Sequence, residues 1–193
     1  MLASTSRYRR ELLSRLGIPF EVAAPGVDES PRAGEPPRAT ALRLAEAKAR
    51  AVAGGRPRGL VIGSDQVADC DGEAIGKPGT HAAAATQLAR LSGRTVVFHT
   101  AVALVNAATG RVQLACVDVA STYRALTPGE IEHYLRRETP YDCAGSVRSE
   151  GLGVALFERI ASDDPSALVG LPLITVARML RGEGVDVLAG GGA

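Results

Sequence analysis

The chain has 193 residues, of which 46% are hydrophobic and 22% charged, so it can bury a sizeable core without disulfides. Its net charge of +1 and its aromatic content of 4%, with no tryptophan, argue against nucleic-acid binding. No apolar run is long enough to span a bilayer, and the N-terminal MLASTSRYRR lacks the apolar stretch of a signal peptide. The three cysteines lack paired CxxC spacing and are expected to be buried free thiols, so we expect a cytoplasmic protein without nucleic-acid or membrane partners.

Short apolar runs alternate with helical stretches along the chain. In the first half, periodicity and caps predict five elements in order: a strand at 2–3, a helix capped by Ser4–Ser6 and ended by Gly17, a strand at 20–23, a helix at 40–53 and a buried strand at 59–63. A loop rich in proline and glycine separates the third and fourth of these elements.

In the second half, turn and cap signals predict a further series: a hairpin turn at Asp71-Gly72, a helix at 80–90, strands at 94–105 and 111–123 joined as a long hairpin, a capping-box helix at 127–137, a strand at 154–160 and a helix at 172–181. The sequence contains no repeat and no interdomain linker. A single α/β domain over residues 1–193, built on a mixed sheet, is therefore predicted.

All but two of the 22 basic residues are arginine. Lys48 and Lys77 are therefore candidates for sites that need a compact ammonium, such as a phosphate site, although two surface lysines would give the same count. The segment Ser4–Arg10 places hydroxyl and guanidinium groups at a predicted helix start, where an anion is stabilised. An ordinary basic, solvated first turn is the alternative interpretation.

Two acidic residues are candidates for metal binding. Asp65 is predicted to lie at the end of the buried strand, where a carboxylate can hold a metal ion or activate water, although an Asx-turn or a helix cap is also common there. Glu29 lies in a loop and would complete a set of oxygen ligands for a hard cation. Since the sequence contains no GxxxxGK[ST] loop, this inventory predicts metal-assisted attack on a polyphosphate outside the P-loop class.

The histidines and cysteines give weaker signals. His81, His99 and His133 lie in different predicted elements and are expected at the surface or in the core rather than at a metal. Cys116 and Cys143 lack a convincing Cys–His partner set. These residues are therefore not predicted to form a site.

Several motifs occur in one order along almost the whole chain: LASTSRYRRELL, VDES, Glu46-Ala47-Lys48, GSDQV, GKP, LSGR and CAGSVRSEGLG. In this order they resemble the Maf family of nucleotide pyrophosphatases. The later stretch, Ala155–Ile160 followed by DPSALVGLPL, is similar to the YceF-like branch, the 7-methyl-GTP pyrophosphatases. The dTTP/UTP branch differs at Gln66 and Glu150, where it has threonine and glutamine. Relatives usually have a few more residues before the LAS motif, so an unusually short first strand is expected.

The resemblance implies a fold and a reaction. The implied fold is an elongated mixed sheet flanked by helices, with two lobes and a central cleft, as in inosine-triphosphate pyrophosphatases. By position, Asp65 is implied to accept a proton from the water that attacks the α-phosphorus, and Glu29 with Asp65 to hold a divalent cation such as Mg²⁺ or Mn²⁺. The residues implied to contact the triphosphate are Ser4, Arg9, Arg10, Lys48 and Lys77.

Tyr8, Gln66 and Glu150 match the positions that distinguish bases within the family. Guanine presents two neighbouring donors that a carboxylate can accept, and 7-methylation makes the ring cationic. A cationic ring favours an aromatic face such as Tyr8 and an anion such as Glu150. A solvated loop charge is the alternative for Glu150.

The predicted function is hydrolysis of 7-methyl-GTP to 7-methyl-GMP and diphosphate, which removes modified nucleotides from the pool. One alternative is a pyrophosphatase for dTTP, UTP or another non-standard nucleotide. An alternative of another class is a regulator of septum formation and cell division without turnover, a role with which the family is also associated. A homodimer is left open.

Overall fold

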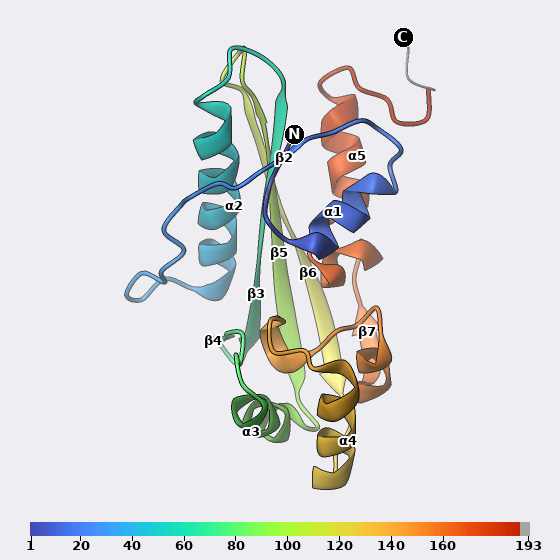
Figure 1. The fold of residues 1–193 in the computed structure, drawn as a ribbon. Coiled ribbons are helices and arrows are strands. Elements are labelled where there is room, and N and C mark those ends of the chain that lie inside the picture. Colours follow the sequence, from blue (N-terminus) through green and yellow to red (C-terminus); the bar gives the residue numbers. More distant parts are fainter. Residues whose placement is uncertain (190–193) are drawn as a thin grey trace.

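The centre of the fold is a long antiparallel hairpin of β5 (Thr95–Asn106) and β6 (Val112–Tyr123), as predicted from the two β-rich runs (Figure 1). The computed structural model that shows it describes residues 1–189, so residues 190–193 of the predicted domain lie outside the described residues. β3 (Leu60–Cys70) pairs antiparallel with β5 along most of its length. These three long strands give the sheet its elongated shape (Figure 1).

Four shorter strands complete the sheet. β1 (Leu2–Ala3) pairs parallel with β2 (Val22–Ala23) on one side and with β3 on the other. β4 (Glu73–Ile75) forms a hairpin with β3, and β7 (Phe157–Ala161) pairs antiparallel with β6. Within residues 1–189 the result is a mixed seven-stranded sheet in the order β2-β1-β3-β5-β6-β7, with β4 attached to β3. The predicted fold class is confirmed.

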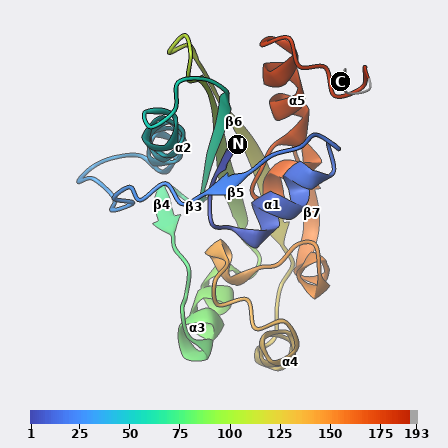
Figure 2. The same ribbon diagram turned by 45° about the horizontal axis from the view of Figure 1, so that its top comes forward.

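The helices gather at two ends of this sheet (Figures 1 and 2). At one end α2 (Pro37–Ala53) covers one face, while α1 (Arg7–Ser14) and α5 (Leu173–Arg181) cover the other. At the opposite end α3 (His81–Leu91) and α4 (Pro128–Glu138) pack around a separate apolar core. The chain therefore has two lobes joined by the long strands.

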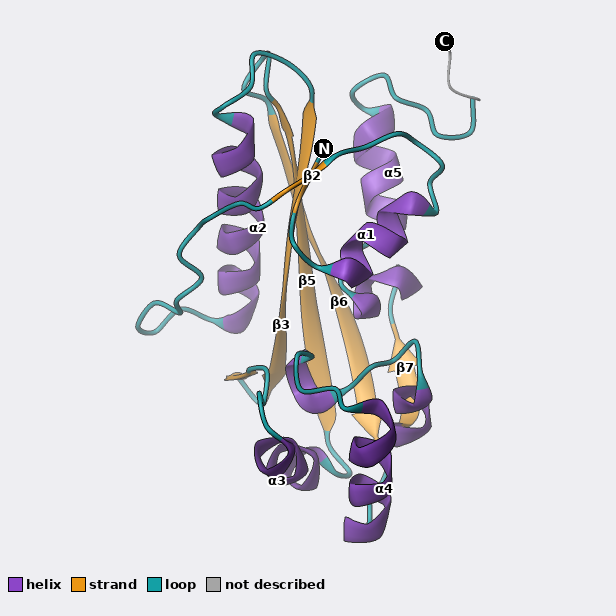
Figure 3. Cartoon of the chain, in the orientation of Figure 1, coloured by secondary structure: helices purple, strands orange, loops and turns teal. Residues whose placement is uncertain are grey.

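Short 3-10 helices occupy the C-terminal connections: η1 (Ala144–Ser146), η2 (Leu152–Leu156) and η3 (Pro165–Val169) (Figure 3). Within residues 1–189, none of the helices has both the length and the apolar character required to cross a bilayer.

Local sequence signals explain many of the element ends. Ser6 caps α1 by accepting from the Arg9 N–H, and Thr127 and Glu130 form the expected capping box of α4. Asp71 and Gly72, both with positive φ, form the two-residue turn between β3 and β4. These three predictions are confirmed.

Several predicted boundaries are wrong by two or more residues, among them the start of the strand expected at 20–23, which begins at Val22. The strand expected to end at Gly63 continues to Cys70, because pairing with β5 satisfies its backbone well beyond the apolar run. The strand expected from Val154 begins only at Phe157, since η2 occupies the preceding residues. The helix expected from Thr40 begins at Pro37, which has no N–H to lose at a helix start.

Candidate active site

The candidate site lies at a gap along the outer edge of β3. β5 pairs with one edge of β3 along most of its length. On the other edge, β1 pairs with Ile62 and Gly63 and β4 pairs with residues 68–70, and no described strand covers this edge at residues 64–67. A cavity of about 890 Å³ opens at this gap. Both lobes line it, through Ser4–Arg9, the loop after β2, Lys48, Asp65–Val67, Ala74–Lys77 and Asp142. A cavity of this size can hold a nucleotide-sized ligand.

A buried lysine joins two carboxylates in this cavity. The Nζ atom of Lys48 lies 2.7 Å from Oδ1 of Asp65 and 2.7 Å from Oε2 of Glu29. Lys48 is 4% exposed and Asp65 6%, whereas the Glu29 side chain is 57% exposed on its loop. Because a buried charge is costly without a partner, the ammonium and the Asp65 carboxylate stabilise each other in this position.

Asp65 lies in the interior of β3 and not at a strand end, which corrects the prediction from the sequence. Side chains alternate along a strand, so Asp65 and Gly63 lie on the same face, towards α2. A Cβ atom at Gly63 would lie 2.3 Å from the Ala45 carbonyl oxygen and 2.6 Å from the Ala49 nitrogen. Glycine at this position therefore lets α2 lie close enough for Lys48 to reach Asp65.

Arg9 is held by the C-terminal part of the chain. Its Nε donates to the Gly170 carbonyl at 2.9 Å, and the same carbonyl accepts from Ser64 Oγ at 3.0 Å. Burial lowers the pKa of Arg9, while the carboxylates of Asp65 and Glu29 act in the opposite direction. The guanidinium is therefore fixed at the wall of the cavity, close to both carboxylates.

A buried carboxylate organises the segment that holds Arg9. Asp164, which is 2% exposed, accepts from the backbone N–H groups of Ser166, Ile174 and Thr175. It thereby caps the start of α5 and ties it to η3. The same segment contacts Gln66, whose Nε2 donates to the carbonyls of Ala167 and Leu168 at 3.0 Å each.

Tyr8 lies beneath two guanidinium groups at the cavity wall. The Cζ atoms of Arg7 and Arg148 lie 4.7 Å and 5.8 Å from the ring centroid. Burial raises the pKa of the Tyr8 hydroxyl. The Tyr8 ring therefore lies within cation–π distance of two guanidinium groups at the cavity wall.

The structure brings together eight of the ten residues predicted for the site. The cavity is lined by Ser4, Tyr8, Arg9, Glu29, Lys48, Asp65, Gln66 and Lys77. Arg10 is exposed on α1 and is not among the lining residues. Glu150 is exposed and lines a separate cavity of about 430 Å³, beside Pro165 and Leu168.

The surroundings and the burial of the cysteines differ from what the sequence predicts. The prediction that Cys116 lacks a histidine partner is wrong, because its thiol lies beside His99 and Asp118. Pairing of β5 with β6 creates this proximity, and no local motif signals it. The three cysteines are free thiols as expected, but only Cys70 is buried; Cys116 and Cys143 are partly exposed.

Comparison with known proteins identifies one family and relatives that share one name. The family model described as "Maf-like protein" matches residues 1–183. A protein of Albidiferax ferrireducens named 7-methyl-GTP pyrophosphatase is 60% identical over 97% of this chain and 94% of its own length. Proteins of the same name from Cupriavidus metallidurans and Thiobacillus denitrificans are 58% and 57% identical, over 95% and 97% of this chain and 92% and 94% of their own lengths.

Proposed function

The chain belongs to the Maf family, and on that premise we propose that it hydrolyses 7-methyl-GTP to 7-methyl-GMP and diphosphate. The observation that carries the substrate is the identity of 55–60% with relatives named for this reaction, over nearly the whole of both chains. The chemistry of the cavity agrees with it, because paired carboxylates lie beside a lysine and an arginine in a space of nucleotide size.

In the proposed reaction, water attacks the α-phosphorus and the bond to the bridging oxygen of the β-phosphate breaks. Asp65 orients the water and accepts its proton, and diphosphate leaves. Lys48 and Arg9 are held in the cavity before substrate arrives, so their charges can stabilise the negative charge that accumulates on the phosphate oxygens. Lys77, exposed at the rim, and Ser4 would add contacts to the triphosphate.

Arg10 is also proposed to contact the phosphates, but it must do so from outside the cavity lining. Its side chain is exposed on α1, outside the cavity that holds Asp65. Substitution of Arg10 should therefore affect KM more than kcat.

The donor set of the cavity fits a hard divalent cation. Lys48 contacts Oδ1 of Asp65 and Oε2 of Glu29, and within residues 1–189 the other two carboxylate oxygens, Oδ2 and Oε1, accept no hydrogen bond. Mg²⁺ and Mn²⁺ prefer oxygen ligands and commonly combine one or two carboxylates with substrate phosphates. When bound by Glu29 and Asp65, such an ion would neutralise phosphate charge and favour attack by water.

The test is a turnover panel with 7-methyl-GTP, GTP, UTP and dTTP, in which diphosphate and orthophosphate are measured separately. We expect diphosphate from 7-methyl-GTP with the highest kcat/KM, loss of activity in excess chelator, and recovery with Mg²⁺ or Mn²⁺. A preference for UTP or dTTP would favour the other branch of the family. Absence of turnover with every nucleotide would favour a regulator that binds without hydrolysis.

We also propose that Tyr8, Gln66 and Glu150 distinguish the base. Tyr8 and Gln66 line the cavity, and Glu150 follows two residues after Arg148, which lies over the Tyr8 ring. Because Glu150 faces a neighbouring cavity, contact with the base requires the segment around it to move.

Glu150→Gln should lower the ratio of kcat/KM for 7-methyl-GTP to that for UTP by about ten- to a hundredfold, since one charge-assisted pair is lost. Glu158→Gln is the matched control, because Glu158 is exposed and makes no hydrogen bond or ion pair within residues 1–189. An unchanged ratio in Glu150→Gln would remove Glu150 from base recognition.

A nucleotide substrate supports the predicted cytoplasmic location, where the nucleotide pool lies. The lack of nucleic-acid partners stays a prediction from the sequence, and a homodimer stays open.

A further inference from the structure

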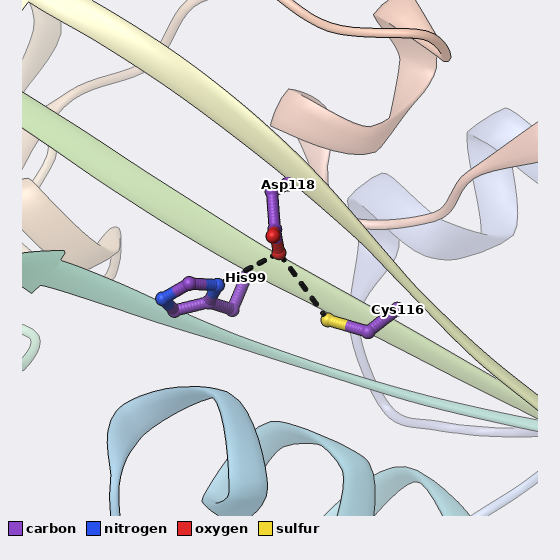
Figure 4. Close-up of side chains that lie close together, drawn as sticks. All are labelled: His99, Cys116 and Asp118. Carbon is purple, nitrogen blue, oxygen red and sulfur yellow. Dashed lines mark hydrogen bonds and ion pairs between the residues drawn. The ribbon is translucent and has the colours of Figure 1, made fainter.

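A group of side chains of the types that can ligate a metal lies outside the lining of the large cavity. His99 is on β5, and Cys116 and Asp118 are on β6 (Figure 4). His99 pairs directly with Asp118 across the two strands, and Cys116 lies two residues away on the same face. This face also holds Asp65. Asp65 and Cys116 lie level with each other on either side of Ala101, so the intervening strand β5 separates the two groups.

Three different donor atoms converge in this group. The Nδ1 atom of His99 lies 2.8 Å from Oδ1 of Asp118, and the Cys116 sulfur lies 3.7 Å from that same oxygen. The three donor atoms all lie within 4.8 Å of one another. Tetrahedral Zn²⁺, with bonds of about 2.0–2.3 Å, holds its ligands roughly 3.3–3.8 Å apart. Small side-chain shifts would therefore place all three donors around one ion.

Neighbouring side chains fix the orientation of two of these donors. Asp69 Oδ2 lies 3.2 Å from Nε2 of His99, so the ring can donate to Asp69 and present its Nδ1 lone pair to the group. Arg38 Nε lies 3.5 Å from the other Asp118 oxygen, which leaves Oδ1 directed at His99 and Cys116. A carboxylate behind a ligating histidine is a common arrangement at zinc sites.

We propose that His99, Cys116 and Asp118 bind one borderline-soft divalent cation such as Zn²⁺, with Asp69 orienting His99 and water as the fourth ligand. The thiolate and imidazole distinguish this site from the all-oxygen carboxylate pair of Glu29 and Asp65, which suits Mg²⁺. His99 is 8% exposed while Asp118 is exposed, so the site is open to solvent on one side.

Binding exchanges a proton for the ion. Burial raises the pKa of the Cys116 thiol to about 12, and the Asp118 charge adds to this shift, so the sulfur is protonated before binding. The Cys116 S–H bond breaks, the sulfur–metal bond forms, and the proton passes to water. The hydrogen between Nδ1 of His99 and Asp118 also leaves Nδ1: in the neutral ring it moves to Nε2, where Asp69 accepts it, and the Nδ1 lone pair binds the ion.

Co²⁺ is the probe for this site, because thiolate coordination gives it a charge-transfer absorption in the near ultraviolet. The full-length protein should show this band, saturating at one equivalent, and excess Mg²⁺ should leave it unchanged. Cys116→Ser should abolish the band, and Cys143→Ser, which removes the other partly exposed thiol, should keep it. Asp69→Asn should keep the band but weaken Co²⁺ binding by about 10–100-fold, as expected for a residue that acts through a ligand.

A second measurement needs no variant. In the unmodified protein, Zn²⁺ should protect Cys116 from a maleimide while Cys143 continues to react, as followed by mass spectrometry of the labelled peptides. Absence of a thiolate band, persistence of the band in Cys116→Ser, or equal labelling of both cysteines with and without Zn²⁺ would each overturn the proposal. Asp69, His99, Asp118 and Arg38 would then be only a network of hydrogen bonds and ion pairs that joins β3, β5, β6 and α2.

Discussion

Lys48 and Asp65 form a buried ion pair, in which each charge offsets the cost of burying the other. Removing one partner of a buried pair typically costs about 3–5 kcal/mol, because the remaining charge stays buried alone. The cost is lower when the substitution removes the charge of Asp65, because Lys48 has a second carboxylate partner. If Asp65 loses its charge, the ammonium still has Glu29 at 2.7 Å on the exposed side.

Asp65→Asn should therefore keep the fold and lose turnover. The amide preserves shape but cannot accept the proton of the attacking water, so kcat should fall by about 10²–10⁴-fold. Diphosphate release measures the loss, and circular dichroism measures the fold. Asp163→Asn is the control, since Asp163 is exposed outside the cavity lining. Turnover of Asp65→Asn within roughly threefold of the parent would refute the role of Asp65 as the proton acceptor.

The close contact of α2 with β3 is the element-level condition for the site. Lys48 is on α2 and Asp65 on β3, and only a residue without a Cβ at Gly63 permits their separation of 2.7 Å. Because the clashing atoms belong to the helix backbone, rotation of a side chain cannot relieve the contact.

Gly63→Ala should push α2 away from the sheet. We expect a loss of about 1–3 kcal/mol in the free energy of unfolding and a lower kcat, because Lys48 moves away from Asp65. Gly55→Ala is the control, since a Cβ there meets nothing within 4 Å. Denaturant unfolding and the diphosphate assay test both effects. Equal stability of the two variants would show that α2 has room to shift at no cost.

The capping box of α4 makes a second element-level prediction. The Thr127 N–H and hydroxyl, and then Arg124, lower the pKa of Glu130 from 4.5 to about 2. The folded state thus binds fewer protons than the unfolded state between these values, and stability is lost as pH falls through them.

Glu130→Gln should accordingly reduce the decline in unfolding free energy between about pH 5 and pH 2, because the amide does not titrate. Urea unfolding at a series of pH values gives the slope, with Glu158→Gln as the control for an exposed glutamate. A slope identical to that of the parent protein would show that the pKa of Glu130 is the same in both states.

At the scale of the whole molecule, the cavity joins two lobes that have separate apolar cores. A nucleotide in the cavity would contact both lobes and bind only the folded state. Such a ligand stabilises the protein by an amount that depends on its concentration relative to Kd.

A non-hydrolysable 7-methyl-GTP analogue at a hundred times its Kd, with Mg²⁺, should add about 2.7 kcal/mol to the unfolding free energy, which corresponds to roughly 5–10 °C in Tm. Omission of Mg²⁺ should shrink the shift, because the phosphates then lose a counter-charge. Thermal unfolding followed by circular dichroism measures both. A Tm that does not change at any analogue concentration would argue against binding in the cavity.

Local patterns in the sequence determined much of the fold. The β5–β6 hairpin, the Asp71-Gly72 turn and the capping box depend on residues close together in the chain, so propensity and turn chemistry predict them. The family resemblance supplied the candidate residues of the cleft, and eight of them do line one cavity.

Only the tertiary structure decided how these residues combine. The length of β3 depends on pairing with β5, so the apolar run that marks its start could not show that Asp65 lies mid-strand. The separation of Glu150 from the cavity and the meeting of Cys116 with His99 depend on strand register and on chain packing. Contacts between residues distant in sequence leave no local pattern, because their free energy is gained only when the sheet and its helices have assembled.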